Sequence, residues 1–105
     1  MKRPLISLAL LAVIGQTAVY AKSITVTIEG FEYKPKKVTV SKGDEVTFIN
    51  KDSAPHTVTP EKESHFQEVS RLLKNQQATV KFDEAGDQKY YCAIHPSMKG
   101  EVVVK

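Results

Sequence analysis

Polar and apolar residues alternate with a period of two along most of this chain. The alternation is found at residues 24–29, 38–41, 46–50, 56–59, 78–82, 88–92 and 101–105. Because successive side chains of a strand point to opposite faces of a sheet, this pattern predicts strands with one buried face. Glycine, proline and asparagine separate the segments, which is typical of a sandwich. We expect an all-β fold of about seven or eight strands in two sheets.

Residues 60–75 do not show this alternation. Phe66, Val69 and Leu72 follow a helical spacing, and Ser64-x-x-Gln67 resembles a capping box. A segment of fewer than about twelve residues forms only a marginal helix without packing. A short helix and an irregular loop therefore both stay open here, and His65 is expected to be solvated rather than a metal ligand.

The first 21 residues have a different character from the rest. A positive start at Lys2 and Arg3 precedes an apolar run over residues 5–14, and Ala21 ends a short stretch of the kind that signal peptidase reads. This pattern predicts a secretory signal peptide over residues 1–21 and a single domain over residues 22–105. The alternative is an uncleaved membrane anchor, but a membrane span needs about 20 apolar residues, more than the roughly ten to fifteen of this run. We therefore expect a periplasmic protein with no membrane span after cleavage.

The charge balance limits the range of partners. Removal of Lys2 and Arg3 with the signal peptide lowers the net charge from +3 to +1. The remaining chain has no basic stripe, so nucleic acid is not an expected partner. A protein partner bound through shape and apolar contact is expected, and the domain itself is expected to be a monomer. A single cysteine excludes an internal disulfide, so its thiol binds a metal, a second chain or nothing.

The residues with distinctive chemistry are concentrated near the C-terminus. Cys92, His95 and Met98 follow one another at a stride of three, and His56 stands upstream after Pro55. Each is ordinary alone, as a buried thiol, a solvated imidazole or a core methionine. Together a thiolate, two imidazoles and a thioether form the ligand set that copper uses for one-electron transfer. A zinc site from the same thiol and imidazoles is chemically possible, but it gives Met98 no role.

A family resemblance agrees with this ligand set. Cys92-x-x-His95-Pro96-x-Met98-x-Gly100, after Tyr90-Tyr91 and with Pro55-His56 upstream, resembles the pattern of the small blue-copper proteins, the cupredoxins. The ligand loop is most similar to that of the amicyanins, since plastocyanins place more residues between the histidine and the methionine. The resemblance covers almost all of residues 23–105. It implies a cupredoxin-like Greek-key sandwich with one type 1 copper ion that alternates between Cu(I) and Cu(II).

The resemblance also implies a function. It indicates a periplasmic one-electron carrier that is not an enzyme and that meets a c-type cytochrome, dehydrogenase or oxidase near His95 and Pro96. The alternative is a periplasmic copper-binding protein for copper tolerance or delivery. Beyond the predicted signal peptide the chain has one methionine and three histidines, which favours transfer over storage. Three histidines are too few for the extra copper centres of a copper oxidase or nitrite reductase.

Three positions bear on how rigid this site is. Many cupredoxins have asparagine after the first histidine, where this chain has Thr57, so a shorter side-chain brace of the cysteine loop is expected. The backbone amide of Thr57 remains able to donate to the sulfur. Gln88 occupies a position where tyrosine is common. Asn50 either caps a turn or ties the His56 segment to the ligand loop, and the second interpretation is slightly favoured.

Overall fold

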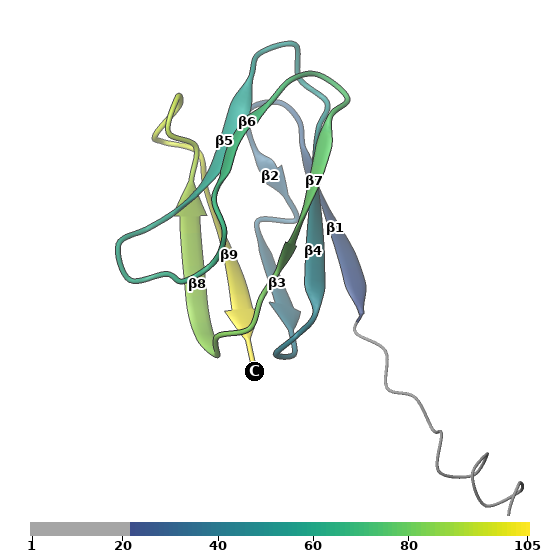
Figure 1. Ribbon diagram of the computed structural model, residues 1–105. Coiled ribbons are helices and arrows are strands. Elements are labelled where there is room, and N and C mark those ends of the chain that lie inside the picture. Colours follow the sequence, from purple (N-terminus) through teal and green to yellow (C-terminus); the bar gives the residue numbers. More distant parts are fainter. Residues whose placement is uncertain (1–21) are drawn as a thin grey trace, which may run out of the picture.

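The structure, a computed structural model, describes residues 22–105, and the predicted signal peptide lies outside the described residues. Nine strands make up the regular structure of this part (Figure 1): β1 (Ser23–Ile28), β2 (Tyr33–Lys34), β3 (Lys37–Val40), β4 (Glu45–Asn50), β5 (His56–Pro60), β6 (Val69–Leu72), β7 (Gln77–Lys81), β8 (Gly86–Tyr91) and β9 (Lys99–Val104). Residues 22–105 include no helix of the length and apolar character that a membrane crossing requires.

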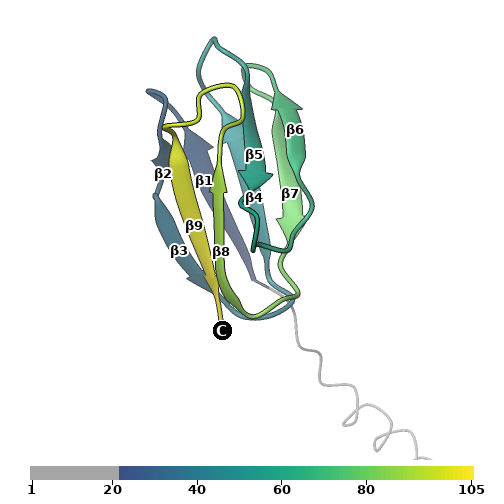
Figure 2. The same ribbon diagram turned by 90° about the vertical axis from the view of Figure 1, so that its left-hand side faces the viewer.

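The strands form two sheets that face each other (Figure 2). One sheet has the order β2-β1-β4-β7, and the other has the order β3-β9-β8-β5-β6. Strands β1 and β4 pair in parallel, as do β3 and β9, whereas the remaining pairs are antiparallel. Several strands that are neighbours in a sheet are distant in the sequence, so the chain crosses between the two sheets, as in a Greek key. The expected all-β, cupredoxin-like sandwich is confirmed.

The core lies between the two sheets and follows the alternation of the sequence. In β4, Val46 and Phe48 are fully buried while Glu45 is exposed. The ring of Tyr90 on β8 stands edge-on to Tyr33 at 4.8 Å and to Phe48 at 5.5 Å between ring centroids. These aromatic contacts join the two sheets. They hold the end of β8, from which the cysteine loop begins.

Residues 60–75 contain a strand and no helix, so the helical alternative is wrong. The hydroxyl of Ser64 accepts a hydrogen bond from the backbone amide of Lys89 on β8 at 2.7 Å and donates to its carbonyl at 2.8 Å. The side chain of Ser64, which suggested a helix cap, therefore bonds to the backbone of β8 instead. Farther on, β6 pairs with β5. Strand β6 and the two-residue β2 were not expected as strands, which is why the total exceeds the predicted one.

Candidate metal centre

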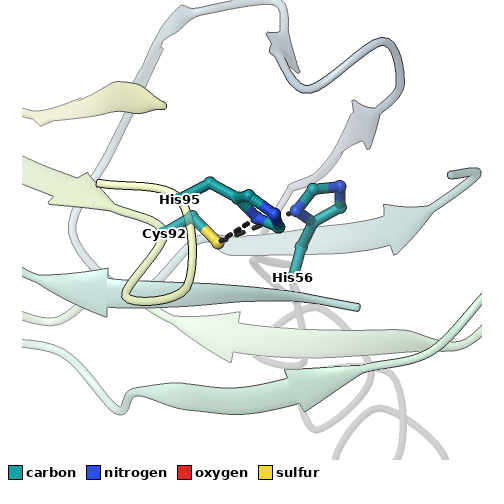
Figure 3. Close-up of side chains that lie close together, drawn as sticks. All are labelled: His56, Cys92 and His95. Carbon is teal, nitrogen blue, oxygen red and sulfur yellow. Dashed lines mark hydrogen bonds between the residues drawn. The ribbon is translucent and has the colours of Figure 1, made fainter. Parts of the chain in front are cut away.

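Three of the four predicted ligands converge at one end of the sandwich (Figure 3). His56 is the first residue of β5, whereas Cys92 and His95 lie in the loop between β8 and β9. The Sγ of Cys92 lies 3.7 Å from the Nδ1 of His56 and 3.7 Å from the Nδ1 of His95. An ion bonded at about 2.0 Å to nitrogen and about 2.3 Å to sulfur, at a trigonal angle, would separate the two atoms by about 3.7 Å. The spacing therefore suits a metal ion held among the three atoms.

The loop between β8 and β9, residues 92–98, is closed by its own backbone. The amide of His95 donates to the carbonyl of Cys92 at 3.1 Å, and the amide of Met98 donates to the carbonyl of His95 at 2.9 Å. The amide of Cys92 in turn donates to the carbonyl of Met98 at 3.1 Å. Two consecutive turns thus connect the predicted ligands in steps of three residues. Met98, the fourth predicted ligand, is buried within this loop with 5% of its surface exposed.

A carboxylate orients the imidazole of His56. The Nε2 of His56 lies 2.8 Å from the Oδ2 of Asp52, and the imidazole is fully buried. An ionised carboxylate only accepts hydrogen bonds, so Nε2 carries the proton and Nδ1 presents its lone pair. Nδ1 is the atom that faces the sulfur of Cys92. Asp52 therefore sets the tautomer that a metal ligand requires.

Thr57 braces the cysteine through both its backbone and its side chain. Its amide donates to the Sγ of Cys92 at 3.3 Å, as expected. Its hydroxyl accepts a hydrogen bond from the amide of Ala93 at 2.7 Å, which directly joins β5 to the ligand loop. The shorter side chain of Thr57 therefore still reaches the backbone of the loop between β8 and β9.

Asn50 ties the His56 segment to β6 rather than to the ligand loop. Its side chain is fully buried and donates to the carbonyls of Ala54 at 2.9 Å and Leu72 at 2.8 Å. Its Oδ1 accepts a hydrogen bond from the amide of Asp52 at 2.8 Å. The favoured interpretation is therefore wrong about the partner, whereas the turn-capping interpretation is confirmed. Asn50 holds the turn that carries Asp52 and leads to His56.

The side chain of Gln88, at a position where tyrosine is common in the family, joins two segments of the chain. Its side chain is buried, accepts a hydrogen bond from the amide of His65 at 2.6 Å and donates to the carbonyl of Glu84 at 3.2 Å. The backbone before β6 is thereby fastened to β8. The residue His65 is exposed, as predicted, and lies outside the cluster of His56, Cys92 and His95.

Sequence reasoning missed the contact of Phe31 with both imidazoles. The Phe31 ring is perpendicular to His56 and His95, at centroid distances of 5.1 and 4.8 Å. Phe31 has a φ of 59° and is 47% exposed, whereas Tyr33, two residues farther on, is buried. Gly30, a turn residue, was the sole hint in the sequence.

Comparison with known proteins agrees with the fold and the donor atoms. The sequence profile of the copper binding proteins of the plastocyanin/azurin family matches residues 20–105. The chain therefore belongs to this family, the cupredoxins. Within residues 22–105 the cluster of His56, Cys92 and His95 fits a type 1 copper site.

Within that family the chain is amicyanin-like. It is 33% identical over 88 residues to amicyanin of Paracoccus versutus, with 81% of this chain and 67% of the relative covered. It is 35% identical over 92 residues to amicyanin of Paracoccus denitrificans, with 79% and 66% covered. A solved Cu(I) form of an amicyanin mutant has a TM-score of 0.73 at 34% identity and covers 87% of this chain and 88% of that chain.

Proposed function

We propose that this cupredoxin is a periplasmic one-electron carrier in which His56, Cys92, His95 and Met98 hold one copper ion. Bound copper supplies the couple between Cu(I) and Cu(II). The observation that carries the proposal is the convergence of one thiol and two imidazoles at 3.7 Å, from β5 and from the loop before β9.

The hydrogen bonds around these side chains support transfer of electrons. Asp52 holds His56, Thr57 holds both the sulfur of Cys92 and the amide of Ala93, and the loop turns hold His95. Side chains that are held in this way rearrange little when the charge at the centre changes. Little rearrangement favours rapid exchange of an electron, and no bond is made or broken in the partner. An enzyme activity is not part of the proposal.

The surface beside His95 supports a docking role. We call the exposed side chains of Phe31, Ile94 and Pro96 the apolar rim; Phe31 is 47% and Ile94 44% exposed. The half-buried His95 lies between Ile94 and Pro96 in the sequence, and its ring contacts that of Phe31. Transient redox complexes use small interfaces. We propose that a monomer docks here, near His95 and Pro96, on a c-type cytochrome, dehydrogenase or oxidase.

Copper tolerance or delivery is the competing function. His56 and Cys92 are both fully buried, which favours retention of the ion over its transfer to another protein. Rapid electron exchange with a c-type cytochrome in stopped-flow measurements supports the carrier. A deletion strain that loses copper tolerance but respires normally contradicts it.

The ligand assignment is tested by spectroscopy of copper-loaded protein. An intense thiolate-to-copper absorption band is expected, with an EPR spectrum of a type 1 centre. The band is expected to be lost in Cys92→Ala. In Met98→Leu it is expected to persist with a changed reduction potential, because a weak axial ligand tunes the site. A band that survives in Cys92→Ala contradicts the assignment. N-terminal sequencing of exported protein tests cleavage after Ala21.

A further inference from the structure

Phe31 lies between both imidazoles and the solvent. Its ring contacts His56 at an interplanar angle of 88° and His95 at 89°, so one edge-to-face contact is made with each. The two imidazoles also contact each other at 5.1 Å between centroids. Because His56 and His95 come from separate segments, a single ring restrains both parts of the cluster. Phe31 as a whole is 47% exposed to solvent.

The backbone at Phe31 takes a conformation that needs support. Phe31 has a φ of 59° and Gly30 a φ of 66°, and a bulky residue rarely adopts the left-handed region. The amide of Gly30 donates to Oδ1 of Asp52 at 2.8 Å, and the amide of Phe31 donates to Oδ2 at 2.9 Å. Asp52 is 21 or more residues away in sequence. A carboxylate from the turn before β5 therefore holds the turn that presents Phe31.

The same carboxylate binds the imidazole that Phe31 covers. The Oδ2 of Asp52 is the acceptor for both the Phe31 amide and the Nε2 of His56. Partial burial raises the pKa of Asp52, but hydrogen bonds from the amides of Phe31 and Gly30 and from His56 outweigh it and lower the pKa overall. The ionised group is an acceptor for all of them. Asp52 thus links the position of the ring to that of His56.

A surface depression borders the ring. It has a volume of about 320 Å³, and Phe31, Lys36, Ser97 and Met98 are among the residues that line it. Solvent therefore approaches the buried Met98 beside Phe31. Because the ring lines this depression and also contacts both imidazoles, removal of the ring would open the depression toward His56 and His95.

We propose that Phe31 is a cover that limits access to the copper and restrains His95, and that Asp52 is the positioning residue that holds this cover over the site. The proposal rests on the proposed copper ligands and adds a role for two residues outside the ligand set. If Phe31 served only as part of the apolar rim, it would affect the docking of a partner but not the retention of the ion.

Release of copper to a chelator tests the cover. Protein loaded with Cu(I) is mixed with excess bicinchoninate, and release is followed by absorbance. We expect Phe31→Ala to release copper about tenfold faster, as loss of two edge-to-face contacts implies. Phe31→Tyr is expected to retain the wild-type rate. Leu73→Ala is the matched control, because Leu73 is 43% exposed and is not part of the site. Equal release from Phe31→Ala and wild type overturns the proposal.

A double-mutant cycle tests the positioning role of Asp52. Asp52→Asn removes one carboxylate acceptor and is expected to accelerate release and to increase hydrogen exchange at the amides of Gly30 and Phe31. If Asp52 acts through the cover, its effect on release is smaller in the Phe31→Ala background. Fully additive effects on release, with unchanged exchange at Phe31, overturn this part of the proposal.

NMR of the metal-free protein separates failure of the cover from failure of the copper assignment. The Phe31 ring is expected to shift the carbon-bound protons of His56 and His95, and Phe31→Ala is expected to abolish these ring-current shifts. Unchanged imidazole shifts overturn the cover whatever the metal. A wild-type protein without the thiolate-to-copper band overturns the proposed function, whereas a normal band with an unchanged release rate overturns the cover alone.

Discussion

Thr57 donates its backbone amide to the Sγ of Cys92 at 3.3 Å and accepts the next amide of the loop, that of Ala93, with its hydroxyl. The hydroxyl oxygens of Thr57 and Thr59 lie 2.8 Å apart, and Thr59 donates to Glu68 at 2.7 Å. Because Thr59 uses its proton on Glu68, Thr57 is the donor between the two threonines. A chain of hydrogen bonds thus runs from the ligand loop along β5 to Glu68 at the surface.

Replacement of the Thr57 hydroxyl is expected to loosen the ligand loop. Thr57→Val keeps the shape and the backbone amide but leaves the Ala93 amide without its acceptor, at a cost of about 1–3 kcal/mol in the free energy of unfolding. Urea denaturation and hydrogen exchange at Ala93 measure the effect. Thr57→Ser retains a hydroxyl and is the control. Unaltered exchange at Ala93 in Thr57→Val would show that the bond does not hold the loop.

The two buried tyrosines are expected to respond in opposite ways to loss of the hydroxyl. Tyr33 donates to the carbonyl of Thr57 at 2.6 Å, whereas the hydroxyl of Tyr90 is the one buried side-chain polar atom in residues 22–105 without a partner. Burial raises the pKa of both, so both stay neutral. Tyr33→Phe is expected to lower the free energy of unfolding by about 1–2 kcal/mol, and Tyr90→Phe to leave it unchanged or raise it. Thermal or urea unfolding measures both. Equal losses in the two variants would contradict the assignment.

Gly100 is expected to tolerate no side chain. Gly100 pairs with Tyr90 across β8 and β9, and a Cβ at Gly100 would lie 2.5 Å from three atoms of the Tyr90 ring end. Tyr90 is fully buried. Gly100→Ala is expected to cost about 1–3 kcal/mol, as overpacked cores do. Combination with Tyr90→Leu should recover part of this loss in the free energy of unfolding, measured by urea denaturation. If no stability is recovered, the clash with Tyr90 is not its cause.

Asp44 is expected to make stability depend on pH in the acid range. The amides of Ser41 and Lys22 donate to its carboxylate at 2.8 and 3.0 Å and, with the charge of Lys22, hold the pKa of Asp44 below its ordinary value despite burial. A lowered folded pKa means that the contribution is complete above the unfolded pKa of about 3.9 and is lost as pH falls through the folded value.

The Asp44 contribution is measured by urea denaturation of Asp44→Asn and wild type between neutral and acid pH. The variant is expected to be less stable at neutral pH, and the difference should shrink below about pH 4. Asp83→Asn is the control, since Asp83 is largely exposed and its nearest cation, Lys81, lies 3.9 Å away. A difference that stays constant with pH would exclude a titrating carboxylate as its source.

Much of this protein is determined by local pattern. Alternation marked the inward residues of the longer strands, such as Val46 and Phe48 of β4, because a strand has a period of two wherever it lies. The stride of three from Cys92 to Met98 marked the ligand loop, since consecutive turns close on every third residue. Residue chemistry also indicated copper, because a thiolate, two imidazoles and a thioether together suit copper, whereas a zinc site gives the thioether no role.

The tertiary structure alone decided the features that depend on residues distant in sequence. Ser64 carries a helix-capping signal, yet its hydroxyl bonds to β8, and β6 forms because β5 offers it an open edge. Phe31 reaches the imidazoles because Asp52, far along the chain, holds its backbone in an unfavourable conformation. Contacts of this kind join residues that are far apart in the sequence and close only in the packed sheets, so no local pattern in the sequence encodes them.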